Sequence, residues 1–167
     1  MCLAMFFFSK EPVKKIVFCS SQRFRREMLQ FIKELRALIQ ENKAPFIILE
    51  PDFDELPEEF LSMSEQERLK DDNYRRQLIW DASNHLFGRV KKADIAFIFN
   101  KNGYLGINTS GELFAAAVLD KKVYALEEKV MMGKYPNELY EEPFVSFLIY
   151  GVTATPKEFF EKIVKEK

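Results

Sequence analysis

The segment that decides the fold is Phe97-Ile98-Phe99-Asn100-Lys101-Asn102-Gly103-Tyr104-Leu105-Gly106-Ile107-Asn108-Thr109-Ser110-Gly111-Glu112. It begins as an apolar strand, passes through a loop with two glycines and short polar side chains, and enters an apolar helix expected at residues 113–119. A strand–loop–helix unit of this kind presents loop amides and a helix N-terminus to ligands at the carboxyl edge of a parallel sheet. Glu112 is expected in the first helical turn, where the helix macrodipole favours a negative charge. It could accept a sugar hydroxyl, attack an electrophilic carbon or simply cap the helix.

Each residue of this loop also has a purely structural interpretation. Ser110 is a good N-cap residue, and Gly103 and Gly106 suit turns that need a positive φ. Taken together, on one loop between a buried strand and an apolar helix, they favour a ligand site. The loop differs from a P-loop because no Lys-Ser/Thr pair follows a glycine-rich run.

Length and composition indicate one α/β domain over residues 1–167, with residues 1–13 as an N-terminal arm. The formal net charge of −1 argues against a partner that is a nucleic-acid polymer bound through a basic surface. The apolar start of the chain is too short to cross a bilayer, so no membrane segment is expected. The chain has two cysteines, Cys2 and Cys19, and a single histidine, His85, so neither a disulfide framework nor a metal site is expected. The expected compartment is the reducing cytoplasm.

Strand-like and helix-like segments alternate along the chain. Strands are expected at residues 15–19, 46–49, 95–99, 123–126 and 144–150, and helices at residues 22–42, 64–92, 113–119 and from Pro156 onward. This alternation predicts a three-layer, doubly wound sheet of about five parallel strands in a flavodoxin-like or Rossmann-like order. A dinucleotide site is not expected, because no Gly-x-Gly-x-x-Gly follows the first strand.

Other features lie outside the central loop. Ser20 and Ser21 follow the first strand, where a hydroxyl can cap the next helix or touch a ligand. The acidic segment 51–60 is either a solvated loop or a lid. Asp81 and His85 are four residues apart, so a continuous helix would place both on one face, as a carboxylate-oriented imidazole or as an ordinary surface pair. Trp80 and Phe87 are expected in the core, although either could instead lie against a base.

The motif Asn-Gly-Tyr-x-Gly-x-Asn-Thr-x-x-Glu at residues 102–112, followed by an alanine-rich helix, resembles the nucleoside 2-deoxyribosyltransferase-like family. The segments at 15–21 and 85–90 resemble it as well, and the resemblance covers roughly residues 14–127. It implies a five-stranded parallel sheet, assembly into homodimers or larger homo-oligomers, and no cofactor. It also implies that Glu112 attacks the anomeric carbon of a 2-deoxynucleoside, after which the glycosyl group passes to another base or to water.

Two hypotheses follow for function. The first is an enzyme acting on a small-molecule nucleoside or nucleotide, in which Glu112 attacks and Asp81 or His85 assists the departing base. The expected substrate-binding residues are Ser20, Ser21, Phe24, Gly103, Asn108, Thr109 and Ser110. The second is a non-catalytic nucleotide-binding or sensor module on the same scaffold. A receiver-type protein fits less well, because no acidic pair follows the first strand.

Overall fold

The protein is built on a five-stranded parallel sheet, seen in a computed structural model that describes residues 12–52 and 58–166. The strand order is β2-β1-β3-β4-β7. The strands are β1 (Lys14–Cys19), β2 (Phe46–Leu49), β3 (Ile95–Ile98), β4 (Lys122–Ala125) and β7 (Gly151–Val152). Every neighbouring pair is parallel, and the strand order is the flavodoxin-like one. The prediction of a doubly wound α/β sheet is confirmed.

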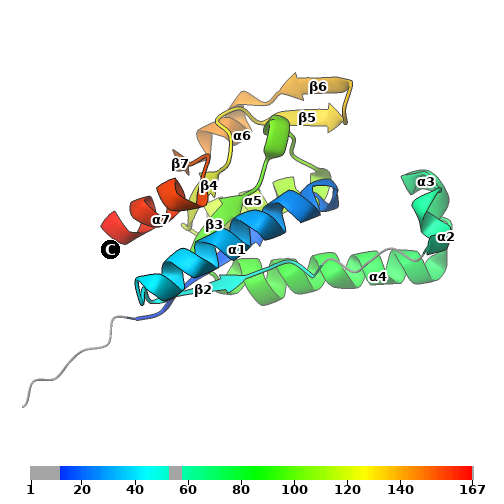
Figure 1. Cartoon of the computed structure of the whole chain (residues 1–167). Helices are drawn as coiled ribbons and strands as arrows, with labels where there is room; N and C mark the ends of the chain where they lie inside the picture. Colours follow the sequence, from blue (N-terminus) through cyan, green and yellow to red (C-terminus); the bar gives the residue numbers. More distant parts are fainter. Residues whose placement is uncertain (1–11, 53–57, 167) are drawn as a thin grey trace, which may run out of the picture.

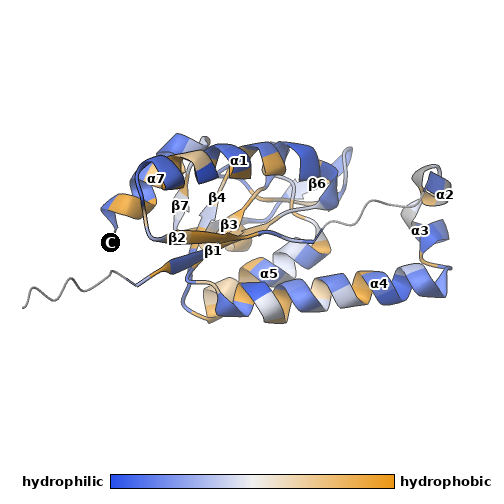
Figure 2. Ribbon diagram, turned by 60° about the horizontal axis from the view of Figure 1, so that its bottom comes forward, coloured by the Kyte–Doolittle hydropathy of each residue, from blue (hydrophilic) through white to orange (hydrophobic). Residues whose placement is uncertain are grey.

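Helices cover both faces of this sheet, so the molecule has three layers (Figure 2). On one face α1 (Arg25–Glu41) and α7 (Pro156–Lys165) pack against an aromatic core. Its centre is Phe97, whose ring centroid lies 4.6–4.9 Å from those of Phe18, Phe31 and Phe159. On the other face α5 (Ile107–Val118) packs on smaller residues of the sheet. Successive strand residues point to opposite faces, so each strand contributes to both cores.

The helix expected at residues 64–92 is present but divided, and the end of the segment expected as a loop or lid at 51–60 is helical as well. The chain between β2 and β3 contains α2 (Glu58–Leu61), α3 (Glu65–Arg68), α4 (Asp72–Ser83), the π-helical turn η2 (Asn84–Arg89) and the 3₁₀ turn η3 (Val90–Lys92). Ser64 and Glu67 form a capping box, since the Glu67 carboxylate accepts from the Ser64 amide at 2.8 Å. Figure 1 shows α4 leading away from the sheet to α2 and α3 at its far end.

Two predicted elements near the C-terminus are corrected by the structure. Residues 144–150, expected as the fifth strand, contain most of α6 (Pro143–Phe147), and the fifth strand is the short β7 that follows. Pro143 takes the first helical position, where its fixed φ favours a helix over a strand. A hairpin of β5 (Met131–Lys134) and β6 (Glu138–Glu141), not predicted from the sequence, lies between β4 and α6. The expected final helix is confirmed as α7, with Pro156 in its first turn.

The prediction that Trp80 and Phe87 lie in the core was wrong, because these side chains are 68% and 64% exposed. No residue of α4 is buried, so this helix presents apolar side chains to the surface rather than to the core. Residues 1–11 of the expected arm and 53–57 of the expected lid lie outside the described residues. None of the described helices is both long and apolar enough for a bilayer crossing.

Candidate functional site

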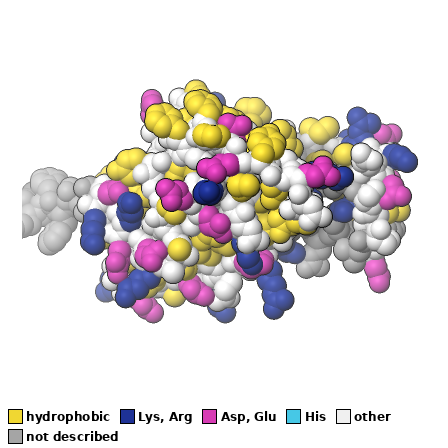
Figure 3. Space-filling view, turned by 90° about the horizontal axis from the view of Figure 1, so that it is seen from above, with side chains coloured by type: hydrophobic (Ala, Val, Ile, Leu, Met, Phe, Trp, Pro, Cys, Tyr) yellow, Lys and Arg dark blue, Asp and Glu magenta, His cyan; other side chains and the backbone are white. Residues whose placement is uncertain are grey.

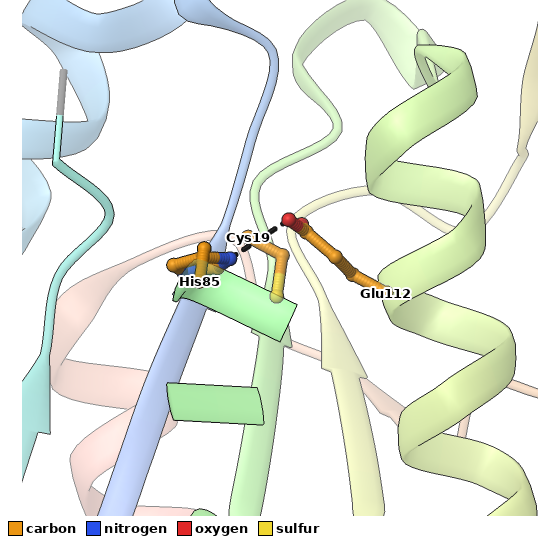
Figure 4. Close-up of side chains that lie close together, drawn as sticks. All are labelled: Cys19, His85 and Glu112. Atoms are coloured by element: carbon orange, nitrogen blue, oxygen red, sulfur yellow. Dashed lines mark hydrogen bonds and ion pairs between the residues drawn. The ribbon is translucent and has the colours of Figure 1, made fainter. Parts of the chain in front are cut away.

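Glu112 comes from the helix that follows β3, but not from its first turn. Helix α5 begins at Ile107, not near residue 113, so Glu112 lies in its second turn and the macrodipole acts on it more weakly than predicted. Ser110 is therefore inside the helix and is not its N-cap; its hydroxyl donates to the Ile107 carbonyl at 2.7 Å. Glu112 is only 9% exposed, and its side chain turns toward the end of the sheet rather than outward (Figure 4).

The side chain of His85, from η2, contacts the side chain of Glu112, from α5. The distance between His85 Nδ1 and Glu112 Oε1 is 2.7 Å, and both side chains are buried. A carboxylate can only accept, so an ionised Glu112 requires the ring proton of this contact on His85 Nδ1. The π-helical turn at Asn84–Arg89 widens the helix locally, which changes the direction in which His85 points. His85 therefore pairs with a carboxylate 27 residues away in the sequence.

Cys19 is the third member of this cluster, and the sequence analysis did not identify it as a site residue. It is the last residue of β1 and is completely buried. Burial raises the pKa of the Cys19 thiol well above its ordinary value, and the charge of Glu112 and a hydrogen bond to it raise the pKa further. The thiol therefore stays protonated and donates to Glu112. Its position at the carboxyl end of a strand, directly before Ser20, was the signal available in the sequence.

The three residues meet at the point of the sheet where ligands bind in open α/β folds. In the sheet β1 lies between β2 and β3, so the strand order reverses at β1. The topological switch therefore lies at the carboxyl ends of β1 and β3. Cys19 ends β1, and Glu112 lies on the helix that follows β3. The ligating atoms of Cys19, His85 and Glu112 all lie within 4.8 Å of one another. We refer to these three residues as the switch-point cluster.

Asp81 does not share a hydrogen bond with His85 among those seen in the structure. Its carboxylate accepts from Gln77 one turn earlier on α4, at 2.8 Å. The expected pairing of Asp81 with His85 assumed a continuous α-helix. The π-helical turn η2 begins at Asn84, between Asp81 and His85. The structure thus brings His85 to Glu112, and leaves Asp81 on the preceding helix.

The other predicted binding residues differ in their surroundings. The Ser20 hydroxyl donates to the Phe99 carbonyl at 3.3 Å and joins the ends of β1 and β3. Ser21 precedes the 3₁₀ turn η1 (Gln22–Phe24) without a side-chain cap. Thr109 is buried, and Asn108, in the first turn of α5, is exposed.

Phe24 and Gly103 belong to a packed corner formed with the β5–β6 hairpin. The Phe24 ring packs edge-on against Tyr104 and Tyr135. Gly103 has φ +72°, and an added Cβ would lie 2.9 Å from the Lys129 carbonyl oxygen. This glycine is required by the turn and by the close approach of the hairpin.

Asn100 is a second residue that sequence reasoning missed. It is fully buried, and its side-chain oxygen accepts from the amides of Leu126 and Glu127 at 3.0 Å. Its side-chain nitrogen donates to the carbonyls of Glu127 and Lys129. These bonds fix the loop after β4 against the loop after β3, and so hold the entry to α5 in place.

Comparisons with known proteins support the fold and leave the activity open. No protein-family model matches the chain, and no curated protein matches it. A conserved protein from Enterococcus faecalis V583, of known structure, aligns with a TM-score of 0.58 and 15% identity over 93% of this chain and 99% of that one. At that identity the likeness is one of fold.

Two enzymes of known structure align over most of the chain with lower scores. A 2-deoxyribosyltransferase from Bacillus psychrosaccharolyticus has a TM-score of 0.44 and 17% identity, over 87% of this chain and 90% of that one. A CMP N-glycosidase from Clostridium botulinum has a TM-score of 0.42 and 14% identity, over 92% and 100%. With TM-scores below 0.5, these two alignments carry no argument about residues or chemistry.

Proposed function

We propose that the protein cleaves the N-glycosidic bond of a nucleoside or nucleotide, or transfers its deoxyribosyl group, with Glu112 as the nucleophile. The observation that carries the proposal is the buried contact of 2.7 Å between His85 and Glu112 at the switch point of the sheet. A carboxylate positioned there by an imidazole has the chemistry required to stabilise and capture an oxocarbenium-like anomeric carbon.

The reaction would proceed in two displacements. In the first, a Glu112 oxygen bonds to the anomeric carbon while the bond to the base nitrogen breaks, and the base leaves with that electron pair and takes up a proton. In the second, water or another base attacks the same carbon and releases Glu112. The bond from His85 Nδ1 holds the carboxylate in one orientation throughout, which reduces the reorganisation needed at each step.

His85 is the better candidate to assist the base. The ring lies against Glu112, whereas Asp81 accepts from Gln77 on its own helix. Within the described residues, His85 Nε2 is buried and has no hydrogen-bond partner, so in the imidazolium form it could give its proton to the departing base while Nδ1 keeps its bond to Glu112. A positioned acid of this kind contributes about 10²–10⁴-fold to the rate.

The test is base release measured by chromatography, with a panel of deoxynucleosides and deoxynucleoside monophosphates. We expect Glu112→Gln to lower the rate by about a thousandfold or more, and His85→Gln by about a hundredfold. Asp81→Asn is the matched control and is expected to retain activity. Release that persists in Glu112→Gln and Glu112→Ala contradicts the role of Glu112, and loss in Asp81→Asn alone assigns the proton to Asp81.

A trapping experiment identifies the nucleophile directly. A 2′-deoxy-2′-fluoroarabinosyl nucleoside should form a slowly hydrolysed glycosyl-enzyme, because the fluorine destabilises the oxocarbenium-like transition state. Intact-mass analysis is expected to show one added glycosyl group in the wild type and none in Glu112→Gln. Peptide mapping that places the group on another residue refutes the mechanism.

A second candidate is a nucleotide-binding module without catalysis, and the burial of Glu112 favours it. Its side chain is 11% exposed and already has His85 as a partner, and Cys19 lies beside it. A carboxylate satisfied in this way can serve as a fixed acceptor for a ribose hydroxyl. This function predicts that a nucleotide raises the melting temperature without being consumed.

We also propose that the chain self-associates through the side of the sheet that carries Glu112. The elements α4, η2, α5 and α6 expose large apolar side chains with exposed fractions of 62–82%, among them Ile79, Trp80, Phe87, Ile107 and Phe147. Figure 3 shows hydrophobic side chains gathered along the edge of the molecule away from α1. Exposure of this extent is typical of a protein interface.

Trp80 is the only tryptophan in the chain, so its fluorescence reports on this surface. Self-association is expected to give a multiple of 19.7 kDa in sedimentation equilibrium and a blue shift of the emission as concentration rises. Trp80→Phe with Phe87→Lys should shift the protein toward the monomer. A wild-type protein that stays monomeric at all concentrations contradicts this proposal.

A further inference from the structure

The switch-point cluster contains three different metal-ligating groups in one small volume. A thiol, an imidazole and a carboxylate lie with their ligating atoms within 4.8 Å of one another, and all three residues are buried. They come from β1, η2 and α5, three segments that the fold brings together (Figure 4). Soft and borderline divalent cations, Zn²⁺ above all, are bound by sets of this composition.

The His85 imidazole is also incompletely hydrogen-bonded. His85 is 4% exposed, and its Nε2 has no hydrogen-bond partner among the described residues. A buried polar atom without a partner is rare in folded proteins because its desolvation is not compensated. The imidazole is therefore held by one bond only, to Glu112, and keeps one ring nitrogen uncommitted.

We propose that Cys19, His85 and Glu112 form a binding site for a single Zn²⁺ ion, with one coordination position left open to solvent or to an anion. Three protein ligands and one open position are the arrangement of reactive zinc sites rather than of closed structural ones. Cys19 supplies the sulfur that distinguishes Zn²⁺ from Mg²⁺ and Ca²⁺, which prefer oxygen ligands.

Small side-chain movements suffice for coordination. Zinc–ligand bonds of about 2.0–2.3 Å place neighbouring ligand atoms of a tetrahedron about 3.3–3.7 Å apart. The contact of 2.7 Å between His85 and Glu112 must therefore open by about 0.6–1.0 Å, and the largest separation in the cluster, at most 4.8 Å, must close by up to about 1.1–1.5 Å. Rotation about side-chain bonds covers such changes without moving β1 or α5.

The binding step is balanced by the release of one proton. The S–H bond of Cys19 breaks, its proton passes to solvent, and the thiolate electron pair forms the bond to zinc. The neutral imidazole moves its single proton from Nδ1 to Nε2 and binds zinc through Nδ1, the nitrogen that faces Glu112, and the Glu112 carboxylate binds as it stands. No oxidant or reductant takes part.

This inference does not depend on the proposed glycosyl chemistry, but it has a consequence for it. Zinc would occupy the carboxylate and the imidazole that the two displacements require. The metal-loaded protein is therefore expected to be inactive in base release, and the metal-free protein active. Zinc availability would then control access to the site.

The test uses the full-length, tag-free protein, purified with a chelator and then dialysed free of it. A tag must be absent because His85 is the only histidine in the chain. Co²⁺ is added as a spectroscopic substitute for Zn²⁺. We expect a thiolate-to-cobalt charge-transfer band in the near ultraviolet, a stoichiometry of one ion per chain, and loss of the band when Zn²⁺ is added.

The chain supplies its own matched control, because it has two cysteines, Cys2 and Cys19. Cys19→Ser should abolish the band and weaken Zn²⁺ binding by at least about a hundredfold, while Cys2→Ser should change neither. His85→Gln is a second variant that tests the site without altering the thiol, and it should weaken binding similarly. Circular dichroism of each variant checks that it is folded.

Two outcomes overturn the inference: no charge-transfer band in the wild type at millimolar Co²⁺, or a band that survives in Cys19→Ser. Loss of the band in Cys2→Ser would likewise place the sulfur ligand elsewhere. These spectra are recorded without nucleoside. A protein that binds cobalt through Cys19 but releases no base therefore supports the metal site and refutes the glycosyl chemistry. A protein that releases base but binds no cobalt supports the glycosyl chemistry and refutes the metal site.

Discussion

The contact between His85 and Glu112 can be measured by a double-mutant cycle. We consider His85→Leu, Glu112→Leu and the double variant, with the free energy of unfolding obtained from urea titrations followed by circular dichroism. Each single variant leaves a buried polar group without its partner. The double variant removes both groups together and leaves apolar side chains in their place.

The expected magnitudes follow from the geometry. A buried hydrogen bond of 2.7 Å with a carboxylate acceptor contributes about 1.5–3 kcal/mol, and stranding either partner costs about 1–3 kcal/mol more. Each single variant should therefore lose about 2.5–6 kcal/mol, and the double variant should lose less than their sum by about 2 kcal/mol. For a chain of 167 residues, a coupling of about 2 kcal/mol corresponds to about 4–8 °C in melting temperature.

Glu112→Gln is the control for charge. The amide oxygen can still accept from His85 Nδ1, so this variant keeps the hydrogen bond and should lose only about 1 kcal/mol. Equal m-values across the variants are required for the comparison. A coupling energy below about 0.5 kcal/mol, which is the usual error of additivity, would show that the two side chains are not in contact in solution.

Three further predictions concern the scaffold. Phe97→Ala should reduce the free energy of unfolding by about 3–5 kcal/mol in urea titrations, because the ring is completely buried among other aromatic rings; a loss below about 1 kcal/mol would contradict this packing. Gly103→Ala should reduce the free energy of unfolding by about 2 kcal/mol, because Gly103 has a positive φ. Gly111→Ala, where an added Cβ meets nothing within 4 Å, should raise it by about 0.5–1 kcal/mol. Equal effects of the two variants in thermal melts would refute the strain at Gly103. Burial opposes the ionisation of Glu166, but hydrogen bonds from Lys122 and Tyr124 hold its pKa below the ordinary value of 4.5, so its stabilising effect is full above pH 4.5 and is lost as the pH falls through the lower folded-state pKa. Lys122→Met should therefore make acid unfolding less steep in this range, and an unchanged pH profile would show that the pair contributes nothing.

Some local features of the site could be predicted from the sequence, and others could not. The stretch around Glu112 indicated a strand, a loop and a helix, since each has its own hydrophobic period. The start of the helix was misplaced, because Asn108, Thr109 and Ser110 are residues of low helix propensity that are typical of loops and caps. In the fold they occupy the first turn of α5, where Ser110 satisfies a carbonyl of its own helix.

The error at residues 144–150 has a similar origin. Phenylalanine, valine, isoleucine and tyrosine favour strands by propensity, and they are dense in this segment. Pro143 at the first helical position and the packing of Val145 against the α5 side of the sheet favour a helix instead. The strand prediction assumed that the apolar residues of this segment are buried, whereas some of them are exposed on α6.

By itself the sequence determined the layered architecture. Apolar strands buried on both faces, separated by helical crossovers, admit few arrangements other than a parallel sheet, and their right-handed connections restrict the strand order further. The sequence also singled out Glu112 and His85 as separate candidates. Only the tertiary structure decided that they meet, and that Cys19 joins them. The physical reason is that one π-helical turn redirects His85 and the last residue of β1 points to the α5 face of the sheet, and neither direction is set by local sequence pattern.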